Sequence, residues 1–89
     1  MATYKIVFTP RGKKDFKIII HSEYKEKVFD LLEYISIKPY GMPPEYKVLK
    51  GDMEGIVSRR ISRQHRLVYQ VYDEEKIIKV LMMWTHYHK

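Results

Sequence analysis

The first twenty residues pass from a strand-like to a helix-like pattern of apolar positions. Residues 4–8 alternate and are rich in β-branched and aromatic side chains, which predicts a strand. Thr9 then offers a capping hydroxyl before Pro10, a residue type favoured at the first helical position. We therefore expect a helix over residues 10 to about 21. Its buried stripe is expected to contain Phe16, Ile19 and Ile20.

Apolar residues recur at helical spacing in the next segment. The positions i, i+3, i+4 and i+7 are Val28, Leu31, Leu32 and Ile35. This spacing predicts a one-sided helix that begins after Ser22, a residue suited to the N-cap, and ends before Pro39 and Gly41. Residues 40–54 then read as one long loop, which in a compact domain is typically part of a site or a mobile surface excursion.

The second half of the chain reads as three strands, residues 56–61, 65–72 and 76–87, joined by short turns. Short connections make neighbouring strands antiparallel. In the middle strand Leu67, Tyr69 and Val71 share one face, which we expect to meet the core. Residues 77–84 are apolar on both faces, which predicts either a central strand or a strand covered by another chain.

These elements predict one α+β domain over residues 1–89, with helices on one face of a twisted, mainly antiparallel sheet. The first strand can pair at the sheet edge or inside it. With 89 residues, 45% of them apolar, the chain can build one core and has no room for a second domain. It has no cysteine, no apolar run of eighteen residues and no secretion signal. We therefore expect a cytoplasmic protein.

The chain is basic, and its basic residues are clustered. Seventeen Lys and Arg against eleven Asp and Glu give a formal net charge of +6, as expected for a protein whose partner is a polyanion. Six of the basic residues lie in or beside the long loop and the two strands that follow it: Lys47, Lys50, Arg59, Arg60, Arg63 and Arg66. This clustering favours phosphate binding. Arg59 and Arg60 are consecutive on a strand, so they point to opposite faces and cannot both bind one phosphate.

RNA cleavage without a metal needs a base, positive charge for the phosphorane and an acid for the leaving oxygen. Arg60 and Arg66 suit the second task because a guanidinium is always charged and matches phosphate oxygens; the alternative is a solvated arginine paired with Asp or Glu. His86 suits the third task because imidazole takes both protonation states near neutrality. Its alternatives are a surface position at a frayed end and a metal pair with His88. His65 is expected to be structural.

Three segments of the second half resemble the YoeB/Txe branch of the RelE-like toxins. They are residues 49–61 (LKGDMEGIVSRRI), residues 65–69 (HRLVY) and residues 86–87 (HY). The family pattern contains Leu-Lys, a short turn with Gly, Ser-Arg-Arg-Ile, His-Arg-Leu-Val-Tyr and a closing His-Tyr in the same order. The first half of the chain agrees with the family in layout but scarcely in residues.

This resemblance implies a microbial RNase fold and a toxin that cleaves mRNA in the ribosomal A site, leaving a 2′,3′-cyclic phosphate and a 5′-hydroxyl. It implies no metal and no cofactor. Carried over residue by residue, Arg66 matches the arginine that stabilises the scissile phosphate, His86 the general acid and Tyr87 the tyrosine that helps orient the substrate. Arg60 and Lys50 match the supporting cations.

The chain departs from the family pattern in two places. The family's catalytic glutamate lies in a Pro-Glu just before Leu-Lys, whereas here Glu45 stands two residues further away. Glu45 is the expected base, but a gapless alignment puts Lys47 at that position, and a lysine base requires a lowered pKa. The second departure is the tail, because the family commonly ends at the tyrosine and this chain continues with His88 and Lys89.

The resemblance also implies partners. These are a cognate antitoxin of the YefM/Axe type, the ribosome and its mRNA, and no membrane. A basic concave site suits an acidic segment that folds onto it. Homodimers occur in this branch, and a last strand that is apolar on both faces is compatible with one. The two departures motivate an alternative, a non-catalytic module that binds the antitoxin and acts as a corepressor. A general RNA-binding domain is a third hypothesis.

Overall fold

The computed structural model describes residues 3–42, 45–48 and 55–83 of the chain. The described elements, in chain order, are β1 (Lys5–Phe8), α1 (Pro10–Ile19), α2 (Lys25–Ile37), β2 (Tyr46–Val48), β3 (Ile56–Arg60), β4 (Arg66–Tyr72) and β5 (Ile77–Met82). Every predicted helix and strand is present, with ends shifted by a few residues; residues 84–87 of the last predicted strand lie outside the described residues. The order of two helices after one strand, followed by the main strands, is therefore confirmed.

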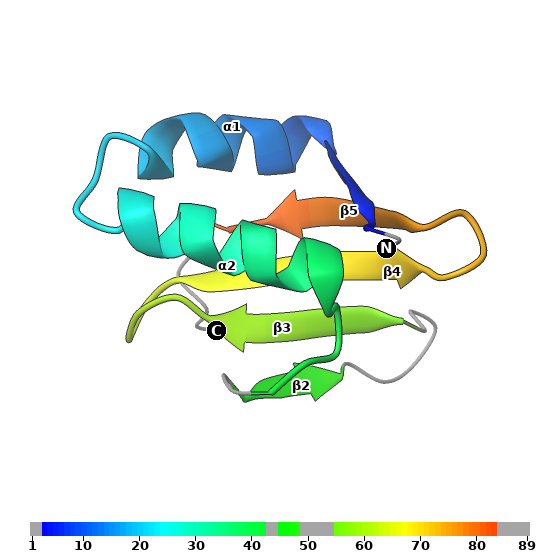
Figure 1. Ribbon diagram of the computed structural model, residues 1–89. Helices are drawn as coiled ribbons and strands as arrows, with labels where there is room; N and C mark the ends of the chain where they lie inside the picture. Colours follow the sequence, from blue (N-terminus) through cyan, green and yellow to red (C-terminus); the bar gives the residue numbers. More distant parts are fainter. Residues whose placement is uncertain (1–2, 43–44, 49–54, 84–89) are drawn as a thin grey trace.

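The five strands form one twisted sheet in the order β1-β5-β4-β3-β2 (Figure 1). All neighbours are antiparallel except β1 and β5, which are parallel. The prediction of a mainly antiparallel sheet is confirmed, and the first strand takes the edge position. β5 lies between β1 and β4, which explains why it is apolar on both faces.

The prediction of one continuous loop over residues 40–54 is wrong, because the loop contains the edge strand β2. β2 is only three residues long and pairs with β3 alone, with Tyr46 opposite Arg59 and Lys47 opposite Ser58. A strand this short shows too little alternation to be recognised from its apolar pattern. Its presence matters because it brings residues of the loop onto the sheet.

The first helix begins as predicted. The Thr9 hydroxyl accepts a hydrogen bond from the Gly12 N–H at 3.0 Å, and Pro10 occupies the first turn. The second N-cap prediction is wrong, because α2 is capped by Tyr24 without a side-chain hydrogen bond. Ser22 instead closes the turn between the helices: its hydroxyl donates to Ile19 O at 2.7 Å and accepts from Tyr24 N at 3.1 Å.

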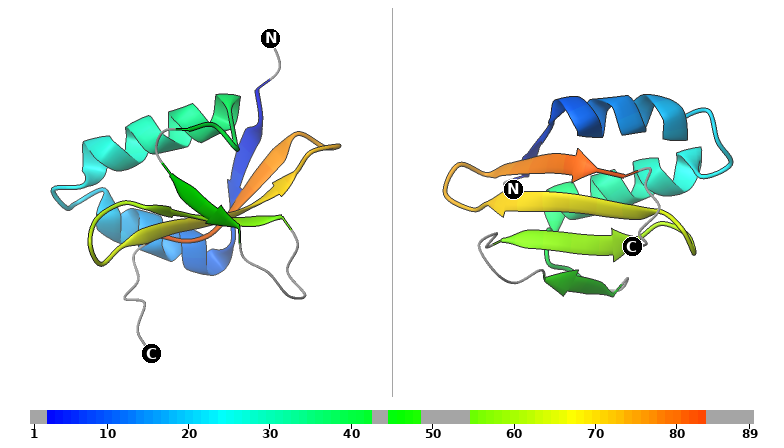
Figure 2. Two further views of the ribbon diagram at one scale, coloured as in Figure 1. Left: turned by 90° about the horizontal axis from the view of Figure 1, so that it is seen from below. Right: turned by 180° about the vertical axis from the view of Figure 1, so that it is seen from behind.

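A single core cluster joins both helices to the sheet. The predicted stripe of α2 is buried, and Ile19 of α1 is fully buried with it, while Phe16 and Ile20 pack at the border. The sheet contributes alternate residues, so that Leu67, Tyr69 and Val71 of β4 face the helices as predicted. Figure 2 shows the twist of the sheet and the helices from two further sides.

Helix α1 is fixed to the end of β5 by a stripe of three residues. Thr9 N donates to Val80 O at 3.0 Å, and the buried carboxylate of Asp15 accepts from Met83 N at 3.2 Å. Between them, Gly12 lies so close to β5 that an added Cβ would be 2.4 Å from Val80 O. The glycine is therefore required by the close approach of two backbones.

We predict that Gly12→Ala destabilises the protein by about 1–3 kcal/mol, although alanine is normally the better residue within a helix. The cause is the clash with the β5 backbone, which cannot move without disturbing its pairing to β1 and β4. Thermal or urea unfolding measures the change, with Lys13→Ala on the exposed face of α1 as a control expected to stay within about 0.5 kcal/mol. Equal stability of Gly12→Ala and the parent would contradict the close packing.

Candidate phosphate-binding groove

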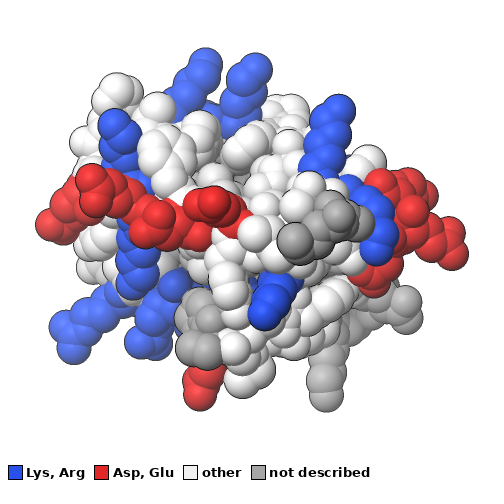
Figure 3. Space-filling model, viewed as in Figure 1, with Lys and Arg blue, Asp and Glu red and all other residues white. Residues whose placement is uncertain are grey.

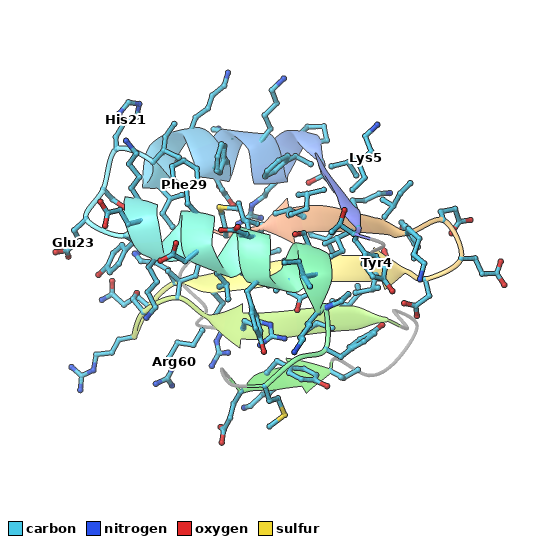
Figure 4. The ribbon with its side chains drawn as sticks, viewed as in Figure 1. Tyr4, Lys5, His21, Glu23, Phe29 and Arg60 are labelled. Carbon is cyan, nitrogen blue, oxygen red and sulfur yellow. The ribbon has the colours of Figure 1, made fainter. Side chains whose placement is uncertain are left out.

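Basic residues gather on the sheet face opposite the helices. Because side chains alternate along a strand, Ser58 and Arg60 of β3 share this face, and the β3–β4 register places Arg60 directly opposite Arg66. Lys47 of β2 lies opposite Ser58 on the same face. Arg60 projects from the end of β3 in Figure 4, where it is labelled. Three cations from three neighbouring strands therefore surround one buried serine.

These residues line a groove with a volume of about 770 Å³. The groove runs from the ends of β2, β3 and β4 to the side of α2. Its walls are formed by Lys27, Asp30, Leu31, Tyr34, Glu45, Tyr46, Lys47, Ser58, Arg60 and Arg66. Two predicted catalytic residues, Glu45 and Arg66, thus share one hollow with Lys47 and Arg60.

The pairing of Arg60 with Arg66 is electrostatically unfavourable by itself. Like charges directly opposite each other on antiparallel strands repel. Among the described residues, no carboxylate forms an ion pair with either arginine, and Arg66 Nη1 has only a long contact of 3.4 Å to Ser58 Oγ. The alternative of solvated arginines paired with Asp or Glu is therefore not what the described part of the chain shows. An anion placed between the two guanidinium groups would relieve the repulsion.

Arg59 has a different environment from Arg60, although the two are adjacent. Its side chain is 0% exposed, and its guanidinium donates to Tyr69 Oη at 2.8 Å and to the carbonyl oxygens of Pro39 and Gly41 at 3.1 and 2.8 Å. The prediction that Arg59 binds RNA is wrong, because a fully buried side chain offers no surface to a phosphate.

The buried Arg59 organises the wall of the groove. Its guanidinium carbon lies 4.8 Å from the centre of the Tyr46 ring and 5.8 Å from that of Tyr34, distances typical of cation–π contacts. Tyr69 Oη in turn donates to Pro39 O at 2.8 Å. Burial raises the pKa of the Tyr69 phenol above its ordinary value, and the neighbouring Arg59 opposes that rise. The turn after α2 is thus fixed to β3 and β4 through one cation.

The remaining predicted site residues have mixed outcomes. Arg63 is exposed in the turn between β3 and β4 and does not line the groove. Lys50, His86 and Tyr87 lie outside the described residues, so their roles stay predictions. His65 is buried, and its backbone carbonyl accepts from Ile61 N and Ser62 N; the structural role expected of its side chain stays a prediction.

Sequence reasoning missed the contribution of α2 to the groove. Four of its residues line the wall: Lys27, Asp30, Leu31 and Tyr34. They follow the spacing i, i+3, i+4 and i+7, so they form one stripe along the helix. The spacing was visible in the sequence, but only the position of β2 shows that this stripe meets a groove. Ser58 was missed as well.

The comparison with known proteins agrees with the fold. A sequence profile described as "YoeB-like toxin of bacterial type II toxin-antitoxin system" matches residues 8–87, which is most of the chain. The chain belongs to this family of toxins. The YoeB toxin of Streptomyces coelicolor is 34% identical over 76 residues, which cover 83% of this chain and 90% of that protein.

Solved structures of YoeB toxins share the fold. The YoeB/ParE toxin from Agrobacterium tumefaciens superposes with a TM-score of 0.83 at 32% identity, covering 93% of this chain and 99% of that one. The YoeB–YefM complex from Staphylococcus aureus gives a TM-score of 0.78 at 31% identity, with coverage of 97% and 100%. The predicted membership of the YoeB branch and the α+β class of the toxin are therefore confirmed.

Within the described part of this YoeB-like toxin, neither helix has the length and apolar character that a membrane span requires. The same residues contain no group of three or more His, Asp or Glu side chains placed to hold a metal ion.

We predict that Arg59→Met destabilises the toxin by about 2 kcal/mol or more, because the buried Tyr69 Oη and the half-buried Gly41 carbonyl lose the Arg59 donor. Arg60→Met is the matched control, since it removes the same charge from the next residue of β3 but at an exposed position. It should change stability by no more than about 0.5 kcal/mol. Denaturant unfolding of both variants makes the comparison. Equal effects would contradict the separate roles of the two arginines.

Proposed function

We propose that this YoeB-like toxin is a metal-independent endoribonuclease that cleaves mRNA on the ribosome. The observation that carries the proposal is the pair of Arg60 and Arg66, which forms no ion pair with a carboxylate of the described residues and shares a groove with Lys47 and Glu45. A phosphodiester gains negative charge as it passes through a phosphorane, and fixed guanidinium groups stabilise that charge. A carboxylate beside the same phosphate can take a proton from the neighbouring 2′-hydroxyl.

The proposed reaction is a transfer of the phosphoryl group from one ribose oxygen to another. Glu45 removes the proton of the 2′-hydroxyl, whose oxygen attacks phosphorus while Arg66 and Arg60 bind the non-bridging oxygens. His86 donates a proton to the departing 5′-oxygen, and Tyr87 orients the substrate. The products are a 2′,3′-cyclic phosphate and a 5′-hydroxyl. Lys47, Lys50 and Arg63 supply supporting positive charge along the RNA, whereas the buried Arg59 takes no part in this set.

Chain connectivity supports the participation of His86. In the β4–β5 pair, Met82 lies opposite Val68, two residues from Arg66. The last described residue, Met83, is therefore at the same end of the sheet as Arg66. His86 follows Met83 by three residues along the chain.

The partners follow from the family. The solved complex of a YoeB with YefM supports a YefM-like antitoxin as the partner of this toxin. A structure of a YoeB dimer from Staphylococcus aureus supports self-association. The ribosome and its mRNA complete the proposed set, and the proposed location is the cytoplasm, where both occur.

A non-catalytic antitoxin-binding and corepressor module is the second candidate function. The observation that favours it is the geometry of β2, in which Lys47 holds the strand position opposite Ser58 while Glu45 precedes the strand. If Glu45 does not reach the 2′-hydroxyl, the groove binds an anion without cleaving it. Growth arrest on expression without antitoxin separates the two functions, because a binding module is tolerated.

We predict that Arg66→Ala and His86→Ala each reduce mRNA cleavage at least about 100-fold in a cell-free translation extract. Mapping the ends of the mRNA measures the cuts, and Lys13→Ala on the distant face of α1 is the control. Circular dichroism of each purified variant shows that it is folded. Cleavage by both variants at the rate of the parent would refute the proposed roles.

The base is tested by comparing Glu45→Gln with Lys47→Gln. If Glu45 is the base, its replacement lowers the cleavage rate about 100-fold or more, because the amide cannot accept the proton. Lys47→Gln then has the smaller effect on the cleavage rate, because it only weakens RNA binding. Added salt should weaken RNA binding by the parent protein in the same way. The reverse order of the two effects would assign the base to Lys47.

A further inference from the structure

The groove is larger than a phosphate requires. Sites of roughly 300–1,000 Å³ hold ligands of drug size, and at about 770 Å³ this groove falls well inside that range. Lys47, Arg60 and Arg66 line it from the sheet, and Lys27 lines it from α2. The remaining wall comes from α2 and from the aromatic side chain of Tyr46.

The part of the groove beside α2 has two half-buried tyrosine rings held in fixed positions. Arg59 contacts the rings of both Tyr34 and Tyr46, and the Tyr34 side chain packs closely on Gly41, where an added Cβ would be 2.5 Å from the phenol oxygen. Rings that are already immobilised lose little entropy when a ligand stacks on them. Nucleobases stack on tyrosine in this way, independently of their sequence.

The groove carries both signs of charge, with Lys27 and Asp30 on its α2 side and with Glu45, Lys47, Arg60 and Arg66 on its sheet side. Figure 3 shows acidic atoms across the face at the level of α2, with Lys and Arg atoms below them at the left. Asp30 is the groove-lining carboxylate on α2, and it is exposed. A carboxylate accepts hydrogen bonds from exocyclic amino groups, as in its pairing with cytosine N4. A nucleotide offers a partner to both kinds of group, a phosphate for Arg60 and Arg66 and, on some bases, an amino donor for Asp30.

We propose that the α2 side of the groove, formed by Asp30, Tyr34 and Tyr46, is a subsite for one nucleobase that carries an exocyclic amino group. The phosphate of the same nucleotide lies between Arg60 and Arg66, and the base stacks against the tyrosine rings and donates to Asp30. This inference rests on the proposed function only in taking RNA as the ligand. It adds a preference among bases that the phosphate site cannot provide.

The test compares three ligands on the full-length protein by calorimetry and NMR titration: cytidine 3′-monophosphate, uridine 3′-monophosphate and ribose 5-phosphate. The two nucleotides have rings of the same size but differ at position 4, where cytosine has an amino group and uracil an oxygen. We expect both nucleotides to bind about tenfold or more tightly than ribose phosphate, because of stacking. Cytidine monophosphate should bind several-fold more tightly than the uridine compound.

Two pairs of variants assign the contacts. Asp30→Ala should abolish the preference for cytidine, whereas Glu33→Ala removes the same charge from the same helix outside the groove and should keep it. Tyr34→Leu should reduce nucleotide binding towards that of ribose phosphate. Tyr34→Phe retains the ring and should bind as the parent does, which controls for loss of fold.

Equal affinities for all three ligands, or a cytidine preference that survives Asp30→Ala, would overturn the subsite. The subsite would also be overturned if an acidic peptide bound to the groove and neither nucleotide did. Failure of the proposed nuclease function gives a different pattern, in which base-dependent binding is present but no mRNA is cut. The two hypotheses can therefore fail separately.

Discussion

The position of Arg60 directly opposite Arg66 depends on the register between β3 and β4. The same register places Val57 opposite Tyr69 on the helix side, where both are fully buried. A slip of β3 by one residue would turn Arg60 toward the core and Val57 away from it. Burial of the core face therefore holds two like charges together on the other face. An anion that binds between the two guanidinium groups relieves their repulsion, and this relief favours anion binding.

Arg59 and Arg60 show how one strand serves the core and the groove together. Arg60 faces solvent, whereas Arg59 lies beneath two tyrosine rings and binds the carbonyl groups of the turn that follows α2. That turn leads to β2, which carries Lys47 into the groove. The buried arginine thus links the helix wall of the groove to its sheet wall. A rigid wall of this kind is what a site needs if it is to bind a flexible single strand.

Much of the fold was predictable because its signals are local. The spacing of Val28 to Ile35 and the Thr9-Pro10 pair specify helices by themselves. β2 was not predictable, because three residues at an edge acquire their structure from pairing with β3. The parallel pairing of β1 with β5 joins the two ends of the chain, and no local pattern records it.

The candidate site was predictable in part for the same reason. Alternation along β3 showed that Arg59 and Arg60 point to opposite faces, but only the packed structure shows which face is the core. The apolar stripe on α2 was predicted as core packing, which is correct, but the neighbouring Asp30 and Tyr34, which line the groove, were not predicted. Glu45 and Lys47 both line the groove, so their positions alone do not identify which of the two is the general base.

The central claim is that Arg60 and Arg66 are held together to share one anion. A double-mutant cycle with Arg60→Gln and Arg66→Gln, followed by thermal unfolding with and without inorganic phosphate at constant ionic strength, tests it most directly. We expect the coupling free energy between the two arginines to be unfavourable to folding in chloride and favourable in phosphate. Phosphate should therefore raise the Tm of the parent but scarcely that of the double variant. An equal rise in Tm for the parent and the double variant would contradict the claim.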